Sequence, residues 1–280
     1  MTRAEKFSKF RQLHSREGAF VMPNPWDAGT ARLFADVGFE ALATTSAGCA
    51  VSAGLRDGAA AVTRARLLQN AREIVAATAL PVSADLEDGF GLTPETCAET
   101  IEMAAEVGLV GGSIEDATGG PEGGVHEIAL AAERVRAAAE AAKGRHFLLT
   151  GRAENYLWDR PDLNDTIARL QAYEEAGADV LYAPGLPDLE AIRTVCAEVG
   201  KPVNVVMGLR PPFYSVQELA EAGVKRISVG GSLVRLAYET LQKATAEILR
   251  TGRFDYAEGL MPGAELMGLM RDAPLERRDG

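Results

Sequence analysis

Residues 82–116 read VSADLEDGFGLTPETCAETIEMAAEVGLVGGSIED and contain one complete strand–helix–strand unit. A short apolar run opens the stretch, another closes it, and each run leads into acidic residues. Between them, Pro94 follows Thr93 at a typical helix start, and the expected helix over 94–107 ends before Gly108. Because the apolar runs are continuous rather than alternating, they indicate parallel strands that are buried on both faces.

The same rhythm repeats along the chain. Further helices are expected over 128–142, 162–176 and 215–222, several of them closed by glycine. The short apolar runs that predict strands cover 19–22, 41–44, 82–85, 112–115, 147–150, 179–182, 203–206 and 226–229. Eight such units in about 230 residues predict an α/β fold, a (β/α)₈ barrel of the TIM type. An open doubly wound sheet is the rival, but no GxGxxG follows the first run.

Both ends of the chain lie outside the eight units, and residues 1–280 are interpreted as one domain because no linker interrupts them. An N-terminal helix is expected within 1–17. The C-terminal tail, residues 250–280, is strongly apolar between 256 and 270. Apolar side chains need a surface to cover, and that surface is either the chain's own barrel or a neighbouring subunit.

Composition narrows the classes of function. The chain has 47% apolar residues and a net charge of −11, from 29 Lys and Arg against 40 Asp and Glu. The apolar fraction excludes disorder, and the charge argues against nucleic acid and anionic membranes as partners. The cysteines, Cys49, Cys97 and Cys196, have no zinc-site spacing. With no secretory signal and no membrane-spanning run, we expect a cytoplasmic protein.

Three acids are expected at neighbouring strand ends. Asp85 and Glu87 follow one run, two residues apart, and Glu115 ends the next run. In a barrel, the carboxyl ends of the strands carry the active site. Three carboxylates at one mouth repel each other unless a cation lies among them, and Mg²⁺ prefers oxygen ligands. We therefore predict a metal site here; solvated loop acids are the alternative.

Two further polar residues, Arg152 and Asn204, are candidates for this site. Arg152, at the end of the fifth run, offers a planar fork for a carboxylate or phosphate. It is equally suited to pair with Glu154 or Glu115. Asn204 lies within an apolar run, where a polar side chain needs a partner. It is expected to bind a substrate carboxylate, or else to cap a layer of the barrel interior.

The loops after the second and fourth runs hold further candidates. Ser46, Ala47 and Gly48 form an expected turn whose N–H groups suit an anion. Asp57 is the only acid of that loop and is either near the metal or a plain turn residue. The glycine-rich loop 117–126 is a candidate lid, and its His126 is a candidate acid–base group or an exposed loop residue.

Taken together, these motifs resemble the isocitrate lyase/phosphoenolpyruvate mutase superfamily over about Asn24 to Ser232. The segments that carry the resemblance are Asn24-Pro25-Trp26-Asp27-Ala28-Gly29, Thr45-Ser46-Ala47-Gly48, Asp85-Leu86-Glu87 with Gly89-Phe90-Gly91, Gly112-Ser113-Ile114-Glu115-Asp116, and Arg152-Ala153-Glu154. As a set they are specific, although each alone is weak.

The resemblance implies a Mg²⁺-dependent barrel, with Mn²⁺ as an alternative ion, that acts on 2-oxo or 2-hydroxy carboxylates through an enolate-like intermediate. By resemblance, Asp85, Glu87 and Glu115 hold the metal, partly through water. Ser46, Ala47 and Gly48 bind a substrate carboxylate, Arg152 contacts substrate oxygens, and Asp57 lies near the substrate. The resemblance also implies a homodimer or homotetramer with a swapped C-terminal helix, which would cover the apolar tail.

The candidate lid, within residues 117–126, differs in sequence from the lids of the superfamily's lyases and of its phosphonate mutases. The lyases carry a Lys-Lys/Arg-Cys-Gly-His lid, whereas residues 118–123 read TGGPEG and contain neither Lys nor Cys. The Lys and Asn of the phosphonate mutases are also missing. We expect a Mg²⁺-dependent lyase that cleaves a C–C bond of a small di- or tricarboxylate, with Asp57, Arg152 and Glu154 as catalytic residues. The alternatives are P–C bond chemistry, and a 2-oxo acid binding protein that has lost catalysis.

Overall fold

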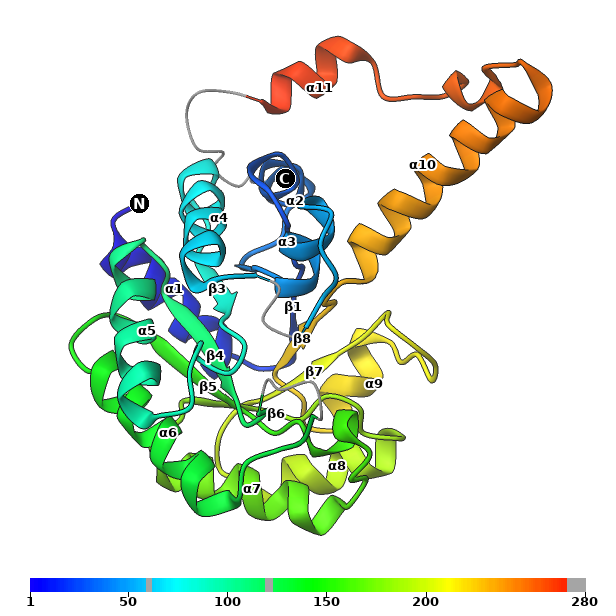
Figure 1. The fold of residues 1–280 in the computed structure, drawn as a ribbon. Helices are drawn as coiled ribbons and strands as arrows, with labels where there is room; N and C mark the ends of the chain where they lie inside the picture. The colour runs from blue at the N-terminus through cyan, green and yellow to red at the C-terminus, as the bar shows by residue number, and fades with distance from the viewer. Residues whose placement is uncertain (59–61, 119–122, 271–280) are drawn as a thin grey trace.

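The fold is a nearly closed barrel of eight parallel strands, as the sequence predicts (Figure 1). The computed structural model describes residues 1–58, 62–118 and 123–270. The strands are β1 (Phe20–Met22), β2 (Leu42–Ala43), β3 (Val82–Asp85), β4 (Gly111–Glu115), β5 (Leu148–Arg152), β6 (Val180–Tyr182), β7 (Val203–Val206) and β8 (Arg226–Ser228). From β2 to β8 each strand pairs with the next one in the sequence, and β1 pairs with β8, so the open-sheet rival is wrong.

The seam between β1 and β2 is closed by hydrogen bonds just beyond the strand ends. The Ala43 N–H donates to the Pro23 carbonyl over 3.1 Å. The Asn24 side-chain amide donates to the Thr44 carbonyl over 3.0 Å, and its oxygen accepts from the Val229 and Gly230 N–H groups. Asn24 therefore ties β1 to both of its neighbours and completes the barrel wall.

Helices alternate with the strands. They are α1 (Arg3–Ser15), α2 (Ala28–Val37), α3 (Ser46–Ser52), α4 (Arg64–Ala77), α5 (Pro94–Glu106), α6 (Ile128–Ala142), α7 (Leu163–Glu175), α8 (Leu189–Glu198), α9 (Val216–Glu221), α10 (Ser232–Thr251) and α11 (Gly263–Leu269), with 3₁₀ turns η1 (Asn155–Trp158) and η2 (Asp255–Ala257). The expected start of α5 is confirmed, since the Thr93 hydroxyl caps the helix and Pro94 is its first residue. No helix of the described ranges is long and apolar enough to cross a membrane.

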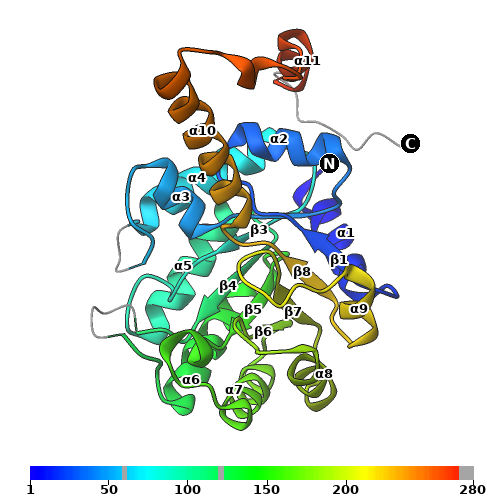
Figure 2. The same ribbon diagram turned by 90° about the vertical axis from the view of Figure 1, so that its right-hand side faces the viewer.

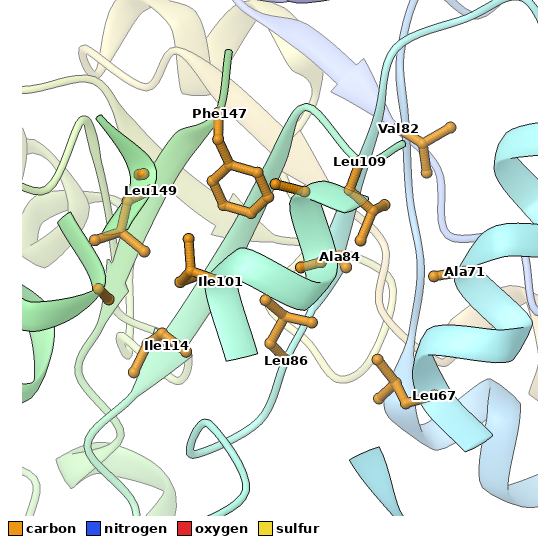
Figure 3. Close-up of a cluster of buried hydrophobic side chains, with 14 of the residues drawn as sticks. Leu67, Ala71, Val82, Ala84, Leu86, Ile101, Leu109, Ile114, Phe147 and Leu149 are labelled. Atoms are coloured by element: carbon orange, nitrogen blue, oxygen red, sulfur yellow. The ribbon is translucent and has the colours of Figure 1, made fainter. Parts of the chain in front are cut away.

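The main core lies between the strands and the helices outside them. Ile101 of α5 packs with Leu86, Ile114 and Leu149, which belong to strands or to the segment just after β3 (Figure 3). All four side chains are at most 1% exposed. Burial of each such side chain contributes about 1.5–3 kcal/mol, so this layer holds the strand ends in place.

The N-terminal helix α1 closes the amino end of the barrel. Its Phe10 is fully buried and clusters with Phe20, Val110 and Leu148, which lie at the beginnings of strands. His14 of the same helix is also buried, and its ring meets those of Phe10 and Phe20 edge to face. The helix expected within 1–17 thus forms the floor of the barrel.

The C-terminal helices leave the barrel. Figures 1 and 2 show α10 extending away from β8, and α11 lying beyond α2. In α10 only Val234 is buried, while Leu241 and Leu249 are 62% and 90% exposed. In α11, Leu269 is buried, but Met267 is 62% exposed. Part of the predicted tail, residues 271–280, lies outside the described residues.

Candidate active site at the carboxyl ends of the strands

A cavity of about 650 Å³ opens at the carboxyl ends of the strands. It brings together six residues that the sequence predicted for the site: Ser46, Asp57, Glu87, Glu115, Arg152 and Glu154. Parallel pairing explains part of this grouping, because Glu115 at the end of β4 lies in register with Arg152 at the end of β5. The same register continues to Tyr182 at the end of β6.

Arg152 is the hub of the site. Its Nε donates to Glu154 over 2.5 Å, and its Nη1 lies 3.3 Å from Glu115 and 3.5 Å from Asp85. The guanidinium carbon lies 5.0 Å from the centre of the Tyr182 ring, a cation–π distance. Burial alone would lower the pKa of Arg152, but Glu154 and Glu115 outweigh it and raise that pKa. The guanidinium therefore stays charged among these acids.

The carboxylates outnumber this single guanidinium. Burial, then Asp85 and Asp57, raise the pKa of Glu87 to about 8. Burial also raises the pKa of Glu115 well above its usual range, although Arg152 opposes the shift. Glu87 has a left-handed backbone with φ 48°, a conformation that costs about 1–3 kcal/mol and is typical of functional sites. The mouth thus holds more carboxyl groups than cations, and a bound cation would favour their ionised forms.

Asp85, Glu87 and Glu115 offer only oxygen donors, which suits Mg²⁺ or Mn²⁺. Among the side chains that the structure describes, no group of three or more His, Cys, Asp or Glu could hold a metal ion between them. Mg²⁺ commonly takes only one or two carboxylates directly and keeps several waters. The donor chemistry and the excess of carboxyl groups over cations therefore fit a hydrated divalent ion, whose binding stays a prediction.

The predicted turn at Ser46–Gly48 is instead the first turn of α3, because the Thr45 hydroxyl caps the helix by accepting from the Gly48 N–H. The Ser46 hydroxyl donates to Asp85 over 2.7 Å, and its N–H donates to the same oxygen over 3.3 Å. Of the described residues, Ser46 lines the large cavity, whereas Ala47 and Gly48 do not. Their contact with substrate, like that of Ser46, stays a prediction.

Asp57 also lines this cavity. Loss of water around its carboxyl group, and then Asp85, raise the pKa of Asp57. A raised pKa brings a carboxyl group closer to the range in which it exchanges protons at neutral pH. The acid–base role expected of Asp57 stays a prediction.

Asn204 lies deeper, in a smaller cavity of about 60 Å³ within the barrel. Its amide nitrogen donates to Ser228 and its oxygen accepts from Arg226, so its side chain is satisfied within the protein. These contacts are those of a residue that caps a layer of side chains inside the barrel, which is the second role expected for Asn204. The cavity also reaches Asp85 and Arg152, which leaves the predicted contact with a substrate carboxylate open.

Sequence reasoning missed the buried acid Asp116. Its Oδ1 accepts from the Glu154 N–H over 2.7 Å, and its Oδ2 accepts from Arg169 and from the Tyr173 hydroxyl. Arg169 also holds the carbonyl of His126, whose ring does not line the main cavity. Asp116 therefore positions Glu154. The one sequence feature that could have pointed to Asp116 is its position directly after the predicted metal ligand Glu115. The loop that begins after Asp116 includes residues 119–122, which lie outside the described residues.

Comparison with known proteins agrees with this architecture. The family model described as phosphoenolpyruvate phosphomutase matches residues 10–249. Oxaloacetate decarboxylase of Pseudomonas fluorescens is 27% identical over 249 residues, 87% of this chain and 83% of that protein. A crystal structure from Burkholderia cenocepacia J2315, provisionally classed as a lyase/mutase, is 51% identical with a TM-score of 0.93, covering 98% of this chain and 99% of that one.

The chain is also similar to the solved structure of a lyase. The crystal structure of 2,3-dimethylmalate lyase, a member of the PEP mutase/isocitrate lyase superfamily, is 25% identical with a TM-score of 0.84. The match covers 96% of this chain and 95% of that one. The superfamily named in that structure is the one that the sequence motifs resemble. The chain belongs to the phosphoenolpyruvate phosphomutase family, within the isocitrate lyase/phosphoenolpyruvate mutase superfamily.

Proposed function

We propose that this protein is a Mg²⁺-dependent lyase that cleaves a C–C bond of a small 2-hydroxy or 2-oxo di- or tricarboxylate. One observation carries the proposal most: the Arg152 guanidinium contacts Asp85, Glu115 and Glu154 at the wall of a cavity large enough for such a substrate. The decarboxylase and the dimethylmalate lyase to which the chain is similar support C–C chemistry over the other reactions of the superfamily.

In this proposal Arg152 binds and orients the substrate. Its guanidinium is held by Glu154 on one side and by the Tyr182 ring, so few rotamers remain to be lost on binding. Its N–H groups stabilise the negative charge that develops on the substrate oxygen as the C–C bond breaks, and such donors contribute about 10²–10³-fold in rate. A bound divalent ion would be held by Asp85, Glu87 and Glu115 and would act as a Lewis acid on the same oxygen.

Proton transfer falls to the acids around that pocket. Asp57, with its raised pKa, accepts the proton of the substrate hydroxyl. Glu154 also has a raised pKa, first because it is buried, and it is suited to return a proton to the carbon left by bond cleavage. The hydrogen bond from the Glu154 backbone N–H to the Asp116 carboxylate fixes the position of Glu154 for this step.

The experiment is a product screen. The protein is incubated with Mg²⁺ and a panel of 2-hydroxy acids, 2-oxo acids and phosphonates, and products are identified by NMR. We expect release of a 2-oxo acid such as glyoxylate or pyruvate from a di- or tricarboxylate, lost on addition of EDTA. Phosphate release from phosphonopyruvate alone would favour the P–C alternative. Binding of a 2-oxo acid with no turnover in the panel would favour the binding-protein alternative.

We also propose that the chain works as a homodimer or homotetramer with exchanged C-terminal helices. Support comes from α10, which extends away from the barrel with Leu236, Leu241 and Leu249 exposed. Exposed apolar residues on one amphipathic helix are typical of an interface. Exposed apolar residues also occur in η2 and α11, namely Tyr256, Leu266 and Met267.

A further inference from the structure

Arg226 places a positive charge inside the barrel without a matching negative charge. The residue begins β8 and is only 4% exposed. Within the described ranges, no carboxylate lies at ion-pair distance from it. A buried ion that lacks a counter-charge is costly by several kcal/mol, so such groups are rare unless something compensates them.

Every partner of Arg226 among the residues that the structure describes is neutral. Its Nε donates to Asn204 over 2.9 Å and its Nη2 donates to Thr150 over 3.0 Å. Its Nη1 lies 3.5 Å from Nε2 of His14. That nitrogen is an acceptor because Nδ1 of His14 donates to the Phe10 carbonyl, and burial lowers the pKa of His14 to about 3. A guanidinium has five N–H donors, so two remain without an acceptor.

The cavity of about 60 Å³ lies beside this guanidinium. By the same measure one water needs about 10–15 Å³, so the space holds a few waters or one small ion, and not a whole dicarboxylate. Apart from Arg226, Arg152 and Asp85, its polar lining consists of neutral hydroxyl and amide groups, among them those of Thr44, Ser83, Asn204 and Ser228. Asp85 is the only acid of this lining, and it is bonded to Ser46 and Arg152.

We infer that this inner cavity binds one compact monovalent anion, a carboxylate group or a halide, against the free N–H groups of Arg226. Two guanidinium ions, Arg152 and Arg226, border a space that only one acid enters. The surrounding hydroxyl and amide groups can donate to the same ion. An anion there offsets the buried charge of Arg226, which the protein's own residues leave uncompensated.

Two sources can supply this anion. It is either a free ion that resides in the barrel, or one carboxylate of a substrate whose remainder lies in the larger cavity. The two cavities share Arg152, which permits the second source. Only the second source rests on the proposed function, because a resident ion needs no reaction at the mouth.

The first test uses bromide on the unaltered protein. Crystals grown in sodium bromide should show an anomalous peak beside Arg226. In solution, replacing sodium gluconate by sodium bromide at constant ionic strength should raise the unfolding midpoint in a saturable way, by about 2–4 °C at several times the dissociation constant. Gluconate is too large for the cavity. No peak together with no saturable shift overturns the inference.

Variants and kinetics identify the site and the source. Arg226→Met should abolish the bromide shift and Arg226→Lys should weaken it, whereas Lys225→Met, which removes the adjacent cation outside the barrel, should leave it intact. An unchanged shift in a folded Arg226→Met protein overturns the inference. Competition between bromide and a turned-over substrate assigns the site to the substrate carboxylate. A bromide shift without competition assigns it to a resident ion. The bromide shift itself is measured without turnover, so it can be observed even if the proposed reaction is wrong.

Discussion

Glu87 should destabilise the metal-free protein at neutral and alkaline pH. Its pKa rises from 4.5 to about 8 on folding, so the folded carboxyl keeps its proton while the unfolded one has released it. Stability is therefore unaffected below pH 4.5, falls as the pH rises to 8, and stays lower above it. At about 1.4 kcal/mol per pKa unit the full loss is about 5 kcal/mol. Because the side chain is only half-buried, solvent screening reduces this loss to about 2–3 kcal/mol.

Glu87→Gln tests this reasoning directly. Urea unfolding in EDTA at pH 8.5 should show the variant more stable than the parent protein by about 2–3 kcal/mol, with no difference at pH 4.5. Both proteins keep the left-handed backbone at this position, so its cost cancels. Glu133→Gln, on the exposed face of α6, is the matched control and should change stability little at either pH. Millimolar Mg²⁺ should close the gap by stabilising the parent protein. Equal stability of Glu87→Gln and the parent protein at pH 8.5 in EDTA would refute the account of the acidic mouth.

Three further predictions concern the framework of the site. Tyr173→Phe removes the hydroxyl that donates to buried Asp116, so urea unfolding should show a loss of about 1–2 kcal/mol, and an unchanged stability would contradict that role. The pKa of His14 is lowered to about 3, so its contribution to stability should be complete above pH 6.5 and fall by about 2 kcal/mol between pH 6.5 and 5, measured as the difference between the parent protein and His14→Gln. Leu241→Glu on α10 should reduce the oligomer in sedimentation, and an unchanged sedimentation coefficient would argue against an interface on this helix.

The fold was predictable because its signals are local and repeated. Continuous apolar runs such as Val203–Val206 are confirmed as strands, and the cap formed by Thr93 and Pro94 is confirmed at α5. The turn predicted at Ser46–Gly48 was wrong in form, because the Thr45 cap that starts a helix there uses the same small polar residues that make turns. Local sequence does not distinguish these two outcomes.

The grouping of the site followed from one rule, that parallel strands end at one face of a barrel. That rule placed Glu115 beside Arg152, and the structure confirms the contact at 3.3 Å. What local sequence could not show is contact between distant segments. Arg226 meets His14 across 212 positions of the chain, and Tyr173 meets Asp116 across 57. Such pairs depend on register and helix packing, which no single motif encodes.

The acids at the barrel mouth are proposed to form a metal-dependent catalytic site. The most direct test of this proposal is Mn²⁺ binding, followed by electron paramagnetic resonance, in the parent protein and in Asp85→Ala, together with turnover of the substrate found by the product screen. We predict that one Mn²⁺ binds per chain of the parent protein, that Asp85→Ala binds it at least about tenfold more weakly, and that metal-dependent turnover is lost. Full metal binding and full activity in Asp85→Ala would contradict the account.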